Sequence, residues 1–230
     1  MVAATATRTH DSIGWERLAG VGGITFAVLV AASNIAVPNP PGWDASGADV
    51  TKFVHDHHAA LAFTVGTFAL TAPSLLAFVG GFVSRVFRSE QKDARLPALI
   101  GVGGAGLICV LFSMVVVSRL VLLGMDGSAA ASAPLAELVW HFEAAAFVLN
   151  MIAIGTAVFG FGIAGARAGL LPPWFRGVGI AGLVASIAAA LPASGVVNGA
   201  SGWQIGLVAF LGWLALLLVA GTRIARDPRG

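Results

Sequence analysis

Histidine and carboxylate side chains gather at one point of the chain, where His55, Asp56, His57 and His58 follow one another. Imidazole nitrogens and carboxylate oxygens bind zinc and similar ions, and His141 could add a further imidazole. On a helix, positions i, i+2 and i+3 split the three histidines between faces, so at most two of them could bind the same ion. The sequence has no HExxH motif, the arrangement of a common zinc site. We therefore expect a hydrated, hydrogen-bonded cluster here, with no metal and no cofactor.

A stripe of hydroxyl side chains continues from this cluster into a long uncharged segment. After His57 come Thr64, Thr67, Thr71 and Ser74, spaced by seven, three, four and three residues. This spacing keeps them on one face of a helix. Hydroxyl groups that faced lipid would have only their own backbone carbonyls as hydrogen-bond partners, so the stripe should face the interior of a helix bundle.

Glu143 and Asn150 form a second polar face, seven residues apart on a later apolar segment. A carboxylate inside a membrane costs several kcal/mol unless it is paired or neutralised. Arg119 lies near the outer end of the preceding segment, at the same depth, and is the natural partner of Glu143. A structural ion pair is one interpretation of these residues, and a substrate or proton site built on them is the other.

Two candidate groups of site residues follow from these patterns. The first is a polar vestibule, open to the outside, that contains His57, Thr64, Thr67, Arg119, Glu143 and Asn150. The second, weaker group is called the outer cluster below and contains His55, Asp56, His58, Glu137 and His141. Because an unperturbed histidine titrates at about pH 6.5, ligand binding that depends on His57 and Glu143 is expected to vary between about pH 5 and 8.

The composition predicts an integral membrane protein. Hydrophobic residues make up 57% of the 230 residues and charged residues only 10%, whereas about 25% charged is usual for soluble domains. After a flexible tail at 1–14, residues 15–230 are expected to form one all-α domain, a bundle of six transmembrane helices. The expected spans are 15–37, 59–84, 96–122, 135–166, 177–191 and 203–222. Ser46 followed by Asp49 predicts that the second helix starts at the membrane surface and enters the bilayer near Ala59.

Lysine and arginine are distributed unequally between the two ends of the expected spans. Eleven of the 13 lie on the side that holds both chain termini, and only Lys52 and Arg119 lie on the other side. Loops rich in these residues stay in the cytoplasm. The bias predicts a multi-pass protein of the cell membrane with both termini cytoplasmic and with the histidine cluster at the outer face.

Two matches to G-x-G-x-x-G, which begin at Gly101 and Gly177, indicate close helix packing rather than nucleotide binding. A dinucleotide-binding loop needs a preceding strand and a soluble βαβ unit, which this apolar chain does not offer. The basic residues lie at the ends of spans and form no patch, so we expect no nucleic-acid partner. The expected partner is the lipid bilayer, with a small-molecule ligand, a second copy of the chain and another membrane protein as further candidates.

Four segments distributed over nearly the whole chain carry a resemblance to known proteins. They are Arg17-Leu18-Ala19-Gly20, Phe53 to Leu61, Gly169-Leu170-Leu171-Pro172-Pro173-Trp174 and Gly212-Trp213. With these residues the chain resembles a group of uncharacterised bacterial six-helix integral membrane proteins that are catalogued as a domain of unknown function. The resemblance implies a membrane location and a bundle of six helices. It transfers no active site, so any role of the histidines rests on this sequence.

Three classes of function remain open. The first is the binding, transport or sensing of a small molecule or ion in the polar vestibule. The second is a structural or accessory subunit of a membrane complex, in which a partner carries the activity. The third is an intramembrane enzyme that uses histidine and glutamate as acid, base or ligand. The sequence favours the first two classes and indicates no reaction and no catalytic residue.

Overall fold

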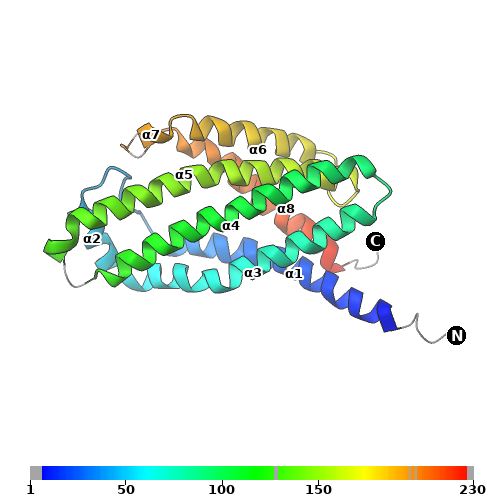
Figure 1. Ribbon diagram of the computed structural model, residues 1–230, viewed down its shortest axis with the longest axis horizontal. Helices are drawn as coiled ribbons and strands as arrows, with labels where there is room; N and C mark the ends of the chain where they lie inside the picture. Colours follow the sequence, from blue (N-terminus) through cyan, green and yellow to red (C-terminus); the bar gives the residue numbers. More distant parts are fainter. Residues whose placement is uncertain (1–6, 127–128, 197, 200, 227–230) are drawn as a thin grey trace.

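The fold is a bundle of long helices that lie side by side (Figure 1). A computed structural model of the chain describes residues 7–126, 129–196, 198–199 and 201–226. Within this part all the regular secondary structure is helical: α1 Thr7–Ala36, α2 Gly47–Asp56, α3 His58–Arg88, η1 Lys92–Ala94, α4 Arg95–Gly124, α5 Ala129–Arg167, α6 Phe175–Ala190, α7 Ala193–Val196, η2 Trp203–Gly206 and α8 Leu207–Arg226. The predicted all-α class and helical bundle are confirmed.

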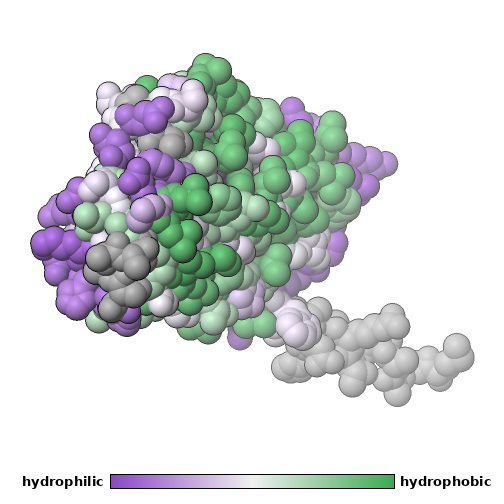
Figure 2. Space-filling model, turned by 60° about the vertical axis from the view of Figure 1, so that its left-hand side comes forward, coloured by the Kyte–Doolittle hydropathy of each residue, from purple (hydrophilic) through white to green (hydrophobic). Residues whose placement is uncertain are grey.

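Five helical segments of the described chain are long and apolar enough to cross a membrane. They are Gly14–Ala36, His58–Arg88, Lys92–Gly124, Ala133–Arg167 and Trp203–Arg226. The α6 helix is shorter, because its 16 residues rise about 24 Å, less than the hydrocarbon core of a bilayer at about 30 Å. On the face shown in Figure 2, hydrophobic residues cover the flank of the bundle and hydrophilic residues gather at its ends. The helices therefore have the length and surface of membrane spans.

The α5 helix occupies the middle of the bundle. It packs against α4, α6, α8 and the short α2, whereas α1 packs against α3 and α8. In the apolar stretch of α5, 67% is buried inside the protein, against 22% in the corresponding stretch of α3. Side chains on α5 are therefore the ones best placed to meet residues from several other helices.

Glycines allow α4 and α5 to approach closely. A Cβ atom added to Gly104 would overlap the backbone of α5, and one added to Gly160 would overlap the backbone of Gly101. Small residues have this role in membrane bundles, where backbones must come near one another for good packing. The sequence prediction holds for Gly101 but is wrong for Gly103 and Gly106, which have open space beside them.

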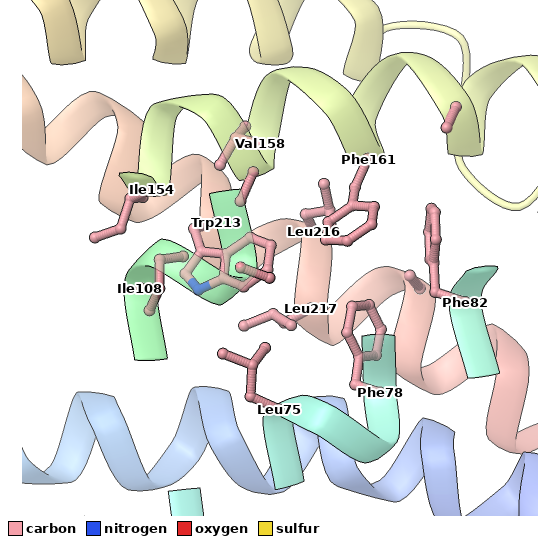
Figure 3. Close-up of a cluster of buried hydrophobic side chains, with 14 of the residues drawn as sticks. Leu75, Phe78, Phe82, Ile108, Ile154, Val158, Phe161, Trp213, Leu216 and Leu217 are labelled. Atoms are coloured by element: carbon pink, nitrogen blue, oxygen red, sulfur yellow. The ribbon is translucent and has the colours of Figure 1, made fainter. Parts of the chain in front are cut away.

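Aromatic and aliphatic side chains fill the bundle around Trp213 (Figure 3). The ring of Phe161 stacks on Trp213 with centroids 6.2 Å apart, and Phe82 meets Phe161 edge to face at 4.9 Å. Phe78, Phe82, Leu216 and Leu217 are all fully buried. Close packing of this kind provides most of the attraction between helices in a membrane, because an apolar side chain gains little free energy when it moves from lipid into protein. This cluster fills the interior of the bundle from Trp213 towards the end at which α1 begins.

The N-terminal boundary differs from the predicted one. The α1 helix begins at Thr7, so residues 7–14 of the expected tail are helical. Residues 1–6 of that tail lie outside the described part of the chain. Residues 7–14 are mostly polar, and a hydropathy pattern detects only the apolar part of a helix, so it gave no sign of these first turns.

The predicted second helix is divided in two at His57. Ser46 caps α2 as expected, because its Oγ accepts a hydrogen bond from the amide of Asp49 at 3.3 Å. The backbone leaves helical geometry at His57, with φ −120° and ψ 21°. The buried face of α2, which includes Val50 and Phe53, packs mainly on α5 and hardly on α3. The prediction of one continuous helix is wrong, because this contact requires α2 to turn away from the axis of α3.

Candidate functional site

A cavity of about 200 Å³ lies between α1, α3, α4, α5 and α8. Seven of its 22 lining residues are aromatic, in a chain with 9% aromatic residues. It reaches from Pro40 beyond the end of α1 to Trp213, where the packed core begins. Thr64, Arg119 and Asn150, three of the six predicted vestibule residues, line it. The cavity is thus an apolar chamber with a few polar groups.

Arg119 connects the polar residues of this chamber. Its Nε donates a hydrogen bond to Oε1 of Glu143 at 2.9 Å, and its Nη1 donates one to Oγ1 of Thr64 at 3.3 Å. The Glu143 side chain is 1% exposed and that of Arg119 is 25% exposed. The predicted ion pair is therefore present, with the carboxylate sealed between helices and the guanidinium at the cavity wall.

The predicted hydroxyl stripe faces the inside of the bundle. Thr64, Thr67 and Thr71 are 4%, 9% and 2% exposed. Thr64 and Thr67 donate hydrogen bonds to carbonyl oxygens one turn earlier in α3, and Thr67 also pairs with Ser33 of α1 at 3.0 Å. Thr67 is not among the residues that line the cavity. Its hydroxyl instead links α3 to α1 through the hydrogen bond with Ser33.

Three buried polar atoms near the cavity lack a hydrogen-bond partner in the described part of the chain: Oδ1 of Asn150, Nε1 of Trp213 and Oε2 of Glu143. Asn150 and Trp213 themselves line the cavity, and they are 6% and 1% exposed. A buried polar atom without a partner costs about 1–3 kcal/mol. Buried polar atoms are almost always satisfied by protein, water or ligand. Two residues that line the chamber, Asn150 and Trp213, thus carry a buried polar atom to which the described chain offers no partner.

His57 does not lie where the sequence predicted. Its Nδ1 is 3.0 Å from the carbonyl oxygen of Phe53, and its ring packs on the Phe53 ring with centroids 4.6 Å apart. His57 does not line the cavity. Glu143 does not line it either, and only its ion pair with Arg119 connects it to the cavity wall. The prediction treated His57 as part of the same helix as Thr64, but the break at His57 moves its side chain to the junction of α2 and α3.

The outer cluster is dispersed over the surface. His55 approaches Asp126, with Nδ1 3.1 Å from Oδ1. Glu137 accepts a hydrogen bond from the amide of Gly47 at 3.2 Å and so joins α5 to the start of α2. His58 is exposed and His141 half-buried. Within the described residues no three histidine, cysteine or carboxylate side chains come together in a way that could bind a metal ion.

Asp56, the remaining member of the outer cluster, forms a surface pair with Lys52, with Nζ 2.6 Å from Oδ2. This hydrogen bond raises the pKa of Lys52 and lowers the pKa of Asp56, since it favours the charged form of both groups. Both side chains are well exposed, so solvent screens their attraction. Asp56 therefore belongs to the surface of α2 and takes no part in the cavity.

A second buried ion pair, at the other end of the bundle, was not predicted. Glu16 of α1 accepts hydrogen bonds from Nε and Nη2 of Arg85 at 3.2 and 3.0 Å and also pairs with Arg88. Glu16 and Arg85 are each 7% exposed. An acidic residue at the second position of the first expected span was the available signal. Arg85 was counted only as a marker of orientation, although it joins α1 to α3.

Sequence reasoning also missed the α1 and α8 contributions to the cavity. Ser33 and Asn34 line it from α1, and Trp213 lines it from α8. A serine or tryptophan in an apolar span is common, so the local pattern did not distinguish these residues. Only the packing of α8 against α5 and α1 brings Trp213 to the cavity.

Comparisons with known proteins provide no relative. No family model matches the chain, and no curated protein or solved structure matches it. The resemblance to uncharacterised six-helix membrane proteins therefore stays a prediction, and the function has to be argued from the residues of the cavity.

Proposed function

We propose that this chain is a six-span protein of the cell membrane, with both termini in the cytoplasm, that binds a small molecule in the cavity beside Arg119, Asn150 and Trp213. Binding would serve transport or sensing. The observation that carries the proposal is the combination of an apolar cavity of about 200 Å³ with buried, unpartnered polar atoms of Asn150 and Trp213 at its wall.

Six spans are supported by the course of the chain. The long helices and α6 alternate in direction, so that α1 begins and α8 ends at the same end of the bundle (Figure 1). The short α6 helix is followed by residues 191–196, which continue with the single-turn α7 and lengthen its path. Arg85, Arg88 and Arg223 lie at the end where α1 begins, whereas Arg119 lies in the other half of the bundle. The positive-inside rule then assigns the first end to the cytoplasm.

Binding is favoured over a permanently open pore. The cavity ends at Trp213, and beyond it Phe161, Phe82 and their neighbours fill the bundle (Figure 3). A molecule that enters from the outer side would stop at this barrier. Transport would therefore need a rearrangement of the core, whereas sensing would need only a small shift of α4 or α8 around the ligand.

The proposal can be tested with two neighbouring valines on α4. Val116 lines the cavity and is 7% exposed, whereas Val117 is 54% exposed on the outside of the bundle. The protein would be purified in its native lipids, and small molecules that accompany it would be identified by mass spectrometry. Val116→Phe should remove the bound molecule because the added ring occupies the cavity.

Val117→Phe is the matched control, since it adds the same ring to the same helix at an exposed position. It should retain the bound molecule. The proposal fails if the natural protein carries no small molecule above the level of empty lipid particles, or if both variants retain it equally.

A further inference from the structure

We propose that the molecule bound in this cavity is a neutral single-ring compound with two carbonyl oxygens on opposite edges, the chemical type of a para-quinone. This inference rests on the proposed function, because it names the ligand class of the same site. It follows from three properties of the cavity: its size and lining, its charge balance, and the kind of polar atoms at its wall.

The size and lining of the cavity fit one substituted ring. An engineered cavity of about 150 Å³ lined by apolar side chains binds benzene, and this cavity has about 200 Å³. The additional space suits a ring with a few small substituents. Phe26, Phe53, Phe112, Phe147 and Phe210 are among the aromatic side chains that line it. Faces and edges of such rings pack well on a flat ligand.

The charge balance of the site requires a neutral ligand. Arg119 already pairs with Glu143 at 2.9 Å, so the two charges cancel. A carboxylate ligand would add an uncompensated negative charge in an apolar chamber, and an ammonium ligand would face the guanidinium of Arg119. Either charge is costly inside a membrane protein unless it is paired.

Two of the side chains at the wall that have free hydrogen-bonding capacity, Trp213 and Arg119, are donors only. An indole nitrogen and a guanidinium can donate hydrogen bonds but cannot accept them. Nε1 of Trp213 has no hydrogen-bond partner among the described residues. Nε and Nη1 of Arg119 donate hydrogen bonds to Glu143 and Thr64, whereas no described residue accepts one from Nη2. A ligand that satisfies both side chains must therefore present a hydrogen-bond acceptor to each, as carbonyl oxygens do. Asn150 can present either its oxygen or, after rotation of the amide, its nitrogen.

The two donors reach the cavity from different helices and heights. Trp213 of α8 lines the cavity together with Ile108 of α4, whereas Arg119 is eleven residues further along α4 than Ile108, about 16 Å by helical rise. Helical side chains lean towards the N-terminus of their helix, so the long Arg119 side chain shortens this gap. A ring with an acceptor on each of two opposite edges fits between the donors.

The test compares three probe molecules of almost equal shape. They are dimethyl-para-benzoquinone, durene, in which methyl groups replace the two carbonyls, and dimethylbenzoate, which is an anion. Binding to the full chain in lipid nanodiscs would be measured by calorimetry against empty nanodiscs. A Cys109→Ala background prevents the only thiol of the chain from adding to the quinone. The quinone should bind about tenfold or more tightly than durene, because each hydrogen bond to a buried donor contributes about 1 kcal/mol.

Trp213→Phe should weaken quinone binding by about three- to tenfold and leave durene binding unchanged, since only the quinone uses the indole N–H. Trp174→Phe, which changes a tryptophan that is 58% exposed at the other end of the bundle, is the matched control and should have no effect on either. If Trp213→Phe does not fold, the comparison of quinone with durene on the natural tryptophan still decides the question.

Each outcome separates the ligand class from the binding function. The carbonyl assignment is overturned if quinone and durene bind equally, or if folded Trp213→Phe prefers quinone as strongly as the natural protein does. Either result leaves the proposed binding function of the cavity intact. Tighter binding of dimethylbenzoate overturns the neutral class, again with the function intact. If none of the three binds, the class is wrong, and the absence of any accompanying molecule from the natural protein would refute the function itself.

Discussion

Replacing Arg119 by methionine should destabilise the protein more than any other single change in the ion pair. The substitution keeps much of the aliphatic length of the side chain but removes the charge that faces Glu143. The Glu143 carboxylate is 1% exposed, and its Oε2 already has no partner in the described chain. Arg119 is the only described residue that donates a hydrogen bond to the other carboxylate oxygen, Oε1, and Arg119→Met would remove that bond.

The expected magnitude follows from this burial. Breaking a buried ion pair by removal of one partner costs about 3–5 kcal/mol. For a chain of 230 residues, 1 kcal/mol corresponds to about 2–4 °C in Tm, so Tm should fall by about 6–20 °C. Glu143→Met should cost less, about 1–3 kcal/mol, because Arg119 is 25% exposed and keeps Thr64 as a partner. The double variant should recover most of the loss, since an apolar pair leaves no unpaired charge.

The assay is thermal unfolding of the four proteins in one detergent, followed by circular dichroism, and a double-mutant cycle built from the four midpoints. The cycle isolates the coupling between the two side chains. Arg17→Met, at an exposed arginine of α1, is the control and should stay within about 0.5 kcal/mol of the natural protein. A loss below about 1 kcal/mol for Arg119→Met, or a double variant as unstable as the sum of both single variants, would show that the pair does not hold α4 to α5.

Three further outcomes are expected. Reporter fusions after Gly230 and within residues 127–133 should give opposite signals, because six spans and the positive-inside bias put these sites on different sides of the membrane; equal signals would contradict the topology. Glu16→Gln should lower the free energy of unfolding by about 1–3 kcal/mol, since it weakens the buried pairing with Arg85 and Arg88, and an unchanged midpoint would assign this cluster no structural role. Elemental analysis of the purified protein should find far less than one zinc or iron per chain, because the histidines of the outer cluster are dispersed; a stoichiometric metal that is lost with His55→Ala would refute this interpretation.

Local patterns in the sequence were sufficient for the class of the protein and for parts of the site. Long apolar segments require helices because lipid offers no hydrogen bonds to the backbone, and the described part of the chain has five helices long and apolar enough to cross a membrane. The spacing of Thr64, Thr67 and Thr71 placed these side chains inside the bundle, where they lie. The pairing of Arg119 with Glu143 also followed from the sequence, because a buried carboxylate needs a positive partner at its own depth.

The cavity and the position of His57 were decided by tertiary structure alone. His57 leaves the hydroxyl stripe because α2 packs on α5, a contact between segments that are about 90 residues apart, as in the hydrogen bond between Gly47 and Glu137. Trp213 becomes a cavity residue because α8 lies beside α1 and α5. Helical periodicity shows which face of one helix is polar, but it contains no information about which helix meets that face or where their side chains leave space. Those properties arise only when all the helices pack together.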